Sequence, residues 1–137
     1  MAFNLFVEAR ETVNVGGGVF LSDAAVEQPF SVVFEDDGET GYFYAHRWNT
    51  ALALWEIVDA LHVYNVEDVV DRQVPAEVKI GWSRDDAKAV LFINDQAQAA
   101  FDFPGKCGYC RSEFPAPARD SGWRRPAWSD EVEGLFA

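Results

Sequence analysis

The segment AEVKIGWSRDDAKAVLFINDQAQAAFDF, which spans residues 76–103, decides the fold class of this chain. From Val78 to Trp82 it alternates apolar and polar residues, which is the pattern of a half-buried strand. Turn formers at 84–86 and at 94–95 divide the remainder into two further strands. Three strands joined by two short turns predict an antiparallel meander.

A second strand pair is predicted upstream of the meander. Residues 30–35 and 42–48 are rich in aromatic and β-branched side chains, and turn formers occupy 36–41 between them. This pattern predicts a β-hairpin whose loop is longer than a tight two-residue turn. Alternation within the second strand places four large side chains on one face: Tyr42, Tyr44, His46 and Trp48.

The sequence of residues 50–61 is compatible with either a helix or a strand. Its apolar residues predict a short helix or irregular turn at 50–56 and a strand at 57–66. The fold class is therefore predicted as mainly β, an antiparallel, meander-containing barrel or sandwich with one or two short helices, one of them at 129–136. An α+β arrangement is the alternative if 50–61 is fully helical. The whole chain, residues 1–137, is predicted to be a single globular domain.

The composition is that of a folded protein with a large core. Of the 137 residues, 49% are hydrophobic and 15% are aromatic, whereas disordered chains contain few aromatic residues. The N-terminal sequence lacks the basic start and long apolar run of a secretory signal, and no stretch approaches the roughly 20 apolar residues of a membrane helix. We therefore expect a cytoplasmic protein with no membrane partner and with reduced cysteines.

The formal net charge of −12 is concentrated in the first half of the chain. Residues 1–71 hold 13 acidic and 2 basic residues, a net charge of −11, whereas residues 72–137 have a net charge of −1. Such a chain repels phosphate backbones, so no nucleic-acid partner is expected. The acids either form a solvated surface or steer a basic protein partner to the chain. The candidate partner-binding residues are Glu35, Asp36, Asp37 and Glu39.

The aromatic residues suggest a different kind of site. An aromatic-lined barrel mouth can bind a small molecule, because ligand pockets are concave and mostly apolar. The candidate ligand-binding residues are Tyr42, Tyr44, His46, Trp48 and Tyr64.

Three short motifs could carry chemistry, and each lacks the residues that its chemistry needs. The pair Cys107 and Cys110 has the spacing of half a zinc site or of a redox dithiol, which makes it a candidate thiol or metal site. No second pair follows, and the surrounding Gly and Pro predict a loop, so no metal or other cofactor is expected. The run Gly16–Gly18 predicts a turn rather than a phosphate-binding loop. His46 and His62 could act as general bases, but no nucleophile motif accompanies them.

Three segments carry a resemblance to a known family. They are VFEDDGETGYFYA at 33–45, LHVYNV at 61–66 and GYCR at 108–111. Together they resemble a family of small uncharacterised bacterial proteins, a domain of unknown function, over about residues 30–115. The resemblance implies a bacterial single-domain protein and brings no activity, cofactor or catalytic residue with it.

No motif in the sequence names a reaction. The favoured hypothesis is a non-enzymatic binding protein that uses its acidic N-terminal half, without excluding an enzyme of another type. The alternatives are a small-ligand-binding β-barrel and a thiol or metal protein centred on Cys107 and Cys110. A β-edge and spare aromatic residues would also allow a homodimer.

Overall fold

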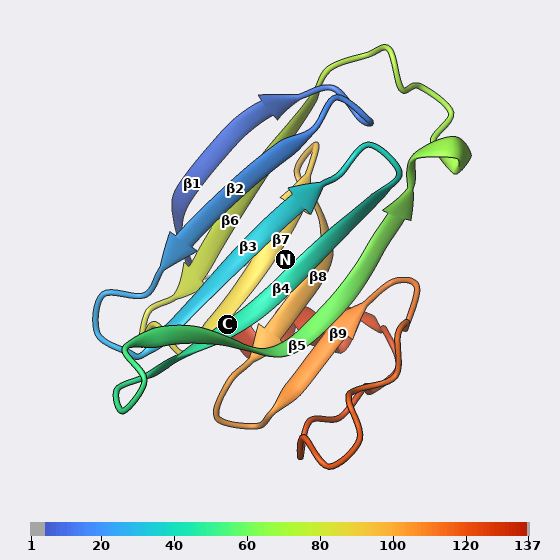
Figure 1. The fold of residues 1–137 in the computed structure, drawn as a ribbon. Helices are drawn as coiled ribbons and strands as arrows, with labels where there is room; N and C mark the ends of the chain where they lie inside the picture. The colour runs from blue at the N-terminus through green and yellow to red at the C-terminus, as the bar shows by residue number, and fades with distance from the viewer. Residues whose placement is uncertain (1–4, 137) are drawn as a thin grey trace.

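The computed structural model describes residues 5–136, which form two antiparallel β-sheets packed face to face (Figure 1). Sheet A has the strand order β1-β6-β7-β8-β9, and sheet B has the order β2-β3-β4-β5. The strands of sheet A are β1 (Leu5–Val13), β6 (Ala76–Ser83), β7 (Lys88–Ile93), β8 (Gln96–Asp102) and β9 (Cys107–Cys110). Those of sheet B are β2 (Val19–Ala24), β3 (Phe30–Asp36), β4 (Thr40–Asn49) and β5 (Leu54–Asn65).

The chain begins in sheet A, makes the four strands of sheet B in succession, and returns to pair β6 with β1. From β6 onward each strand pairs with the one before it, so the predicted meander at 76–103 is confirmed. The predicted hairpin is formed by β3 and β4, whose register begins with Asp36 opposite Gly41. Because two separate sheets form, the fold is a sandwich rather than a closed barrel across the described residues.

The inner faces of the two sheets form the hydrophobic core. Phe43 of sheet B and Phe101 of sheet A are fully buried, and their stacked rings have centroids 5.1 Å apart. Trp82 of sheet A is also buried, and its indole N–H donates a hydrogen bond of 2.7 Å to the Asp23 carboxylate of sheet B. This bond gives a buried polar group a partner on the opposite sheet.

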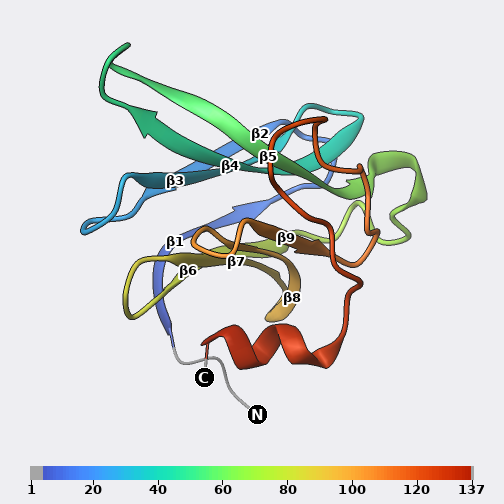
Figure 2. The same cartoon turned by 90° about the horizontal axis from the view of Figure 1, so that it is seen from below.

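The two sheets differ in what covers their outer faces. The C-terminal 3₁₀ helix η2 (Asp130–Phe136) lies against sheet A on the side away from sheet B (Figure 2). Its Val132 and Phe136 are buried together with Val90 and Ala100 of sheet A. No helix or strand within residues 5–136 packs on the outer face of sheet B in this way. Sheet A is therefore an inner layer. The outer face of sheet B carries no described helix or strand, although Phe114 of the C-terminal segment packs edge-on against His62 of β5.

A buried ion pair ties the C-terminal segment to sheet B. The Arg125 guanidinium donates two hydrogen bonds of 2.6 Å to the Asp59 carboxylate on β5. It also donates to the carbonyl oxygens of Pro115 and Gly108. A β-carbon at Gly108 would collide with both charged side chains, so this position of β9 requires glycine. The pair joins β5, β9 and residues 115–125 at one edge of the sandwich.

The fold class was predicted correctly, and two local predictions need correction. Residues 50–53 form a turn, as one form of the prediction for 50–56 allowed, but β5 already begins at Leu54, before the predicted strand start at 57. Because 50–61 contains no helix, the α+β alternative is excluded. Within the described residues the only helices are the 3₁₀ segments η1 (Val66–Asp68) and η2. The loop predicted around Cys107 and Cys110 is strand β9, because its backbone pairs with β8.

We expect the Asp59–Arg125 pair to be essential for stability. Arg125→Met should lower the free energy of unfolding by about 3–5 kcal/mol, because it leaves a carboxylate buried without its counter-ion. The side chains of Arg125 and Asp59 are only 6% and 2% exposed, so water cannot replace the missing contact. Urea unfolding monitored by tryptophan fluorescence measures the change. Lys79→Met is the control, since its partner Asp95 is exposed; an equal loss in both variants would contradict this prediction.

Candidate functional site

The open outer face of sheet B carries the row of large side chains predicted from the sequence. Tyr42, Tyr44, His46 and Trp48 alternate along β4 with Phe43 and Ala45, which are fully buried in the core. The Tyr42 and Tyr44 rings are stacked, with centroids 5.7 Å apart and an interplanar angle of 21°. We call the row formed by Tyr42, Tyr44, His46 and Trp48 the aromatic row.

Neighbouring strands extend the aromatic row across the sheet. His62 of β5 packs edge-on against Tyr42, with ring centroids 5.3 Å apart. Trp48 and Trp55 make a similar contact, also at 5.3 Å. Ser31 of β3 lies 3.4 Å from His46 Nδ1, and burial lowers the pKa of this imidazole below its usual value. His46 is therefore mainly neutral at pH 7, and it packs in the row as an uncharged ring.

Tyr64 does not belong to the aromatic row. The register of β4 and β5 shifts, so that Tyr42 pairs with His62 whereas Gly41 pairs with Tyr64. Val63 is the extra residue of this β-bulge, and the bulge turns Tyr64 to the inner side of the sheet. The Tyr64 ring there covers Gly41, where any β-carbon would collide with it. The aromatic row and Tyr64 thus face opposite sides of sheet B and do not line one barrel mouth.

The acidic run splits into one buried residue and three near the surface. Asp36 is 2% exposed, and its carboxylate accepts hydrogen bonds from Gly16 N (2.7 Å), Gly38 N (2.8 Å) and the Tyr64 hydroxyl (2.6 Å). It therefore organises two turns and a core tyrosine instead of facing a partner. Its bond to Gly16, whose φ is +84°, also explains the turn at the three glycines.

Two of the remaining acids lie near the aromatic row. Glu35 pairs with Tyr42 on one side and with Phe20 on the other, so it shares the outer face of sheet B with them. Asp37 follows in the β3–β4 turn, where hydrogen bonds from the backbone N–H groups of Thr40 and Glu39 lower its carboxyl pKa. Burial, with further contributions from Glu35 and Asp37, raises the pKa of Tyr44. Glu35 and Asp37 therefore place negative charge near the Tyr42 and Tyr44 end of the aromatic row.

Sequence reasoning missed a second feature of this face. The β4–β5 hairpin extends beyond the rest of sheet B (Figure 2), and we call its outer part, residues 47–57, the arm. Leu52 and Ile57 of the arm are each 63% exposed, and Leu54 and Trp55 are also exposed. The apolar residues of 50–56 predict a short helix or irregular turn, because a helical periodicity assumes that apolar side chains are buried. Only the arm's projection into solvent reveals an exposed apolar surface.

The two cysteines do not form a joint site. Cys107 and Cys110 are both buried, and they lie three residues apart on β9. Side chains three residues apart on a strand point to opposite faces. The Cys107 thiol lies near Tyr109. Burial, and after it the contact with this thiol, raises the pKa of Tyr109 to about 12. Cys110, in contrast, packs in the core between the sheets. This geometry does not bring both sulfur atoms to one metal ion.

Comparisons with known proteins identify the family of this chain. Residues 13–137 match the family described as "Uncharacterized protein conserved in bacteria (DUF2251)". The chain belongs to the DUF2251 family. A Haemophilus influenzae protein described as "Uncharacterized protein" is 41% identical over 104 residues, which cover 74% of this chain. The matched region spans 62% of that relative's own length. No solved structure matches the chain.

The match covers the complete candidate site of this DUF2251 protein. It begins at Val13 and includes sheet B, the arm and the C-terminal segment that carries Arg125. The predicted resemblance over 30–115 is therefore confirmed and extends further in both directions. No helix among the described residues is long and apolar enough to cross a membrane.

The buried Tyr64–Asp36 bond should make this DUF2251 protein sensitive to high pH. Burial and the Asp36 carboxylate raise the pKa of Tyr64 well above its ordinary value of 10.0. Above pH 10 the unfolded chain releases the Tyr64 proton while the folded protein retains it, so the free energy of unfolding falls as pH rises. Tyr64→Phe should reduce this fall, although it costs about 1–2 kcal/mol near pH 8 by removing a donor from Asp36.

Urea unfolding of both proteins between pH 8 and pH 11 tests this expectation. The free energy of unfolding should decline more steeply with pH in the wild type than in Tyr64→Phe. Parallel declines in the two proteins would show that Tyr64 ionises equally in the folded and unfolded states and would contradict the prediction.

Proposed function

We propose that this DUF2251 protein is a non-enzymatic binding protein that holds a basic protein partner against the outer face of sheet B. The observation that carries the proposal is the aromatic row, which lies on an open sheet face beside the carboxylates of Glu35 and Asp37. A face that combines aromatic rings with carboxylates is suited to lysine and arginine side chains.

The chemistry of the row supports this partner class. A lysine ammonium or arginine guanidinium is attracted to the face of a tyrosine or tryptophan ring by about 0.5–2 kcal/mol. A carboxylate beside the ring adds a charge-assisted hydrogen bond. Tyr44 lies in the combined field of Glu35 and Asp37, so a cation on its ring would interact with both groups. Tyrosine and tryptophan are also the residues most enriched at the energetic centres of protein interfaces.

Net charge and exposed apolar surface add to the case. The acidic residues 1–71, with a net charge of −11, include the whole of sheet B. Such an excess accelerates the encounter with a positively charged partner. The arm contributes the apolar area that charge alone does not supply, through Leu52, Trp55 and Ile57. Together the row and the arm offer an apolar centre with an acidic border, which resembles the usual anatomy of an interface.

The other hypotheses receive less support from the geometry. A barrel mouth lined by the aromatic row and Tyr64 would need them on the same side of the sheet, and they lie on opposite sides. A thiol or metal centre would need the sulfur atoms of Cys107 and Cys110 together, and they point apart. The Ser31–His46 contact resembles a nucleophile with its base, but Ser31 is only 6% exposed and its hydroxyl is covered.

Affinity capture with the wild-type protein and two variants tests the proposal. We expect the immobilised protein to capture a basic protein from lysate of the native bacterium and to release it when the salt concentration is raised. Glu35→Lys should weaken binding of the purified partner by about tenfold or more, because a rim cation replaces an attractive charge. Tyr44→Ala should weaken it similarly by removing a ring from the aromatic row. Calorimetric titration measures both effects.

Glu11→Lys provides the matched control, since Glu11 is an exposed acid on β1 of sheet A and the charge changes as in Glu35→Lys. It should leave the affinity unchanged. Equal losses in Glu11→Lys and Glu35→Lys would indicate general charge attraction and overturn the assignment to this face. Sedimentation velocity of the protein alone tests the other possible occupant of this face, which is a second copy of the chain. A dimer that Tyr44→Ala converts to monomer would assign the face to a second copy of the chain and overturn the proposal.

A further inference from the structure

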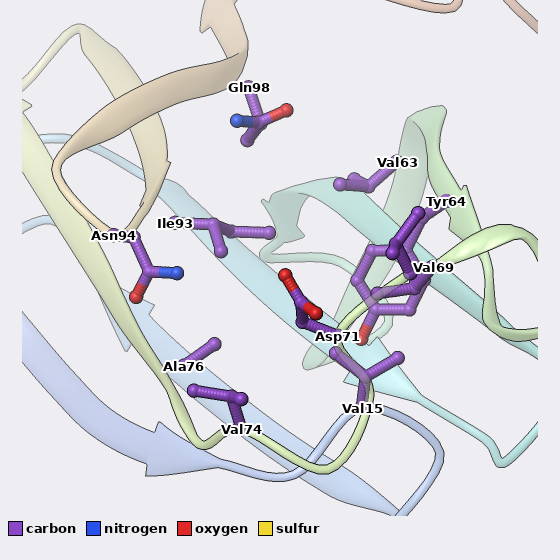
Figure 3. A pocket seen from close by; sticks show the side chains of 11 residues that line it. Val15, Val63, Tyr64, Val69, Asp71, Val74, Ala76, Ile93, Asn94 and Gln98 are labelled. Atoms are coloured by element: carbon purple, nitrogen blue, oxygen red, sulfur yellow. The ribbon is translucent and has the colours of Figure 1, made fainter.

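A cavity of about 400 Å³ opens at one end of the sandwich, away from the outer face of sheet B. It lies where β5 and β7 end and where residues 69–76 pass from one sheet to the other (Figure 3). Its volume is within the range of small-molecule sites, about 300–1,000 Å³. The apolar part of its lining includes Val15, Val63, Val69 and Ile93.

Among the residues that line the cavity, Asp71 alone carries a charge, and that charge is negative. In the view of Figure 3 the Asp71 carboxylate points into the cavity between Ile93 on one side and Tyr64 and Val69 on the other. Within residues 5–136 this carboxylate has no hydrogen-bond or ion-pair partner. The other polar side chains are the amides of Asn94 and Gln98, and no lysine or arginine lines the cavity. An anion would therefore meet one repulsive charge and no cation to offset it.

Tyr64 contributes a ring and not a hydroxyl. Its O–H is already donated to Asp36 at 2.6 Å, which fixes the ring at the cavity wall. A tyrosine ring held in this way can attract a cation through its face. The cavity thus combines one free carboxylate, one immobilised ring and several apolar walls.

We propose that this cavity binds a small organic cation in which an ammonium group is attached to a compact apolar body. The ammonium group is placed beside the Asp71 carboxylate and the Tyr64 ring, and the apolar body lies against Val63 and Ile93. Two exposed side chains support this assignment. Val70 and Val74 line the opening and are 92% and 62% exposed, so a bound apolar body would remove valine surface from water. The inference concerns a separate site and does not depend on the proposed partner.

Three probes of similar size and different charge test the proposal: benzylamine, benzyl alcohol and benzoate. At pH 7 benzylamine is a cation, so it should perturb the backbone amide signals of residues 63–76 and 93–98 in two-dimensional ¹H–¹⁵N NMR spectra. Benzyl alcohol should bind more weakly at the same place, and benzoate should not bind. Asp71→Asn should weaken benzylamine binding by about twofold to fivefold, to the level of the alcohol. Ile93→Phe, which fills part of the cavity, should weaken both benzylamine and benzyl alcohol.

Asp68→Asn is the matched control, since Asp68 lies in the same connection and does not line the cavity. It removes the same charge and should leave benzylamine binding unchanged. Equal weakening by Asp68→Asn and Asp71→Asn, or binding of benzoate as strong as that of benzylamine, would overturn the proposal. Perturbations confined to the aromatic row would also overturn it. Tyr44→Ala should not alter benzylamine binding, so failure of the partner proposal and failure of this one are distinguishable.

Discussion

The arrangement of this protein depends on the buried ion pair between Asp59 and Arg125. Two charges this deeply buried are costly to desolvate, and they are tolerated because the guanidinium is saturated by the carboxylate and by backbone carbonyls. The pair fixes the path of residues 115–125 across the edge of the sandwich. From there the chain continues to η2, which packs on the outer face of sheet A. The backbone of the neighbouring Arg124 also bonds to Lys106 and Gly108 at β9, so the ion pair and these bonds together hold the segment before it reaches sheet A.

The open face of sheet B follows from the position of η2 on sheet A. If the C-terminal helix covers sheet A, no described helix or strand is left for the aromatic row. In that row Trp48 is exposed, and Tyr42, Tyr44 and His46 are half-buried. A sandwich needs only one apolar face per sheet, so tyrosines, tryptophans and an apolar arm on the second face are not required by folding. Trp48 and Trp55 are 38% and 40% exposed there, and exposed apolar surface of this kind supports the binding role that we propose. The acids near it then favour a basic occupant over an acidic one.

Sequence reasoning succeeded where structure is local and failed where it depends on distant partners. The alternation at 76–103 sufficed for the meander, because each strand there pairs with its neighbour in sequence. Strand β9 was missed because it is defined by pairing with β8 and by the Arg125 contact at Gly108, and the short segment has no pattern of its own. The bulge at Val63 moved Tyr64 to the other face, since alternation assumes an unbroken register. The residues of the aromatic row, Glu35 and Asp37 could thus be predicted as candidates for two different sites, whereas their shared face and the arm could not be predicted.

The run from Glu35 to Asp37 shows how neighbouring acids acquire different tasks. Strand alternation turns Glu35 to the outer face and Asp36 to the inner side. There three hydrogen-bond donors offset the cost of burying the Asp36 carboxylate. Asp36 in turn fixes the Tyr64 ring, which forms a wall of the cavity at the sandwich end. The two proposed sites are therefore connected through adjacent residues of one strand, because Glu35 lies beside the aromatic row and Asp36 holds the Tyr64 ring. Their ligands would not compete for space, and the core bond between Asp36 and Tyr64 is the physical link between them.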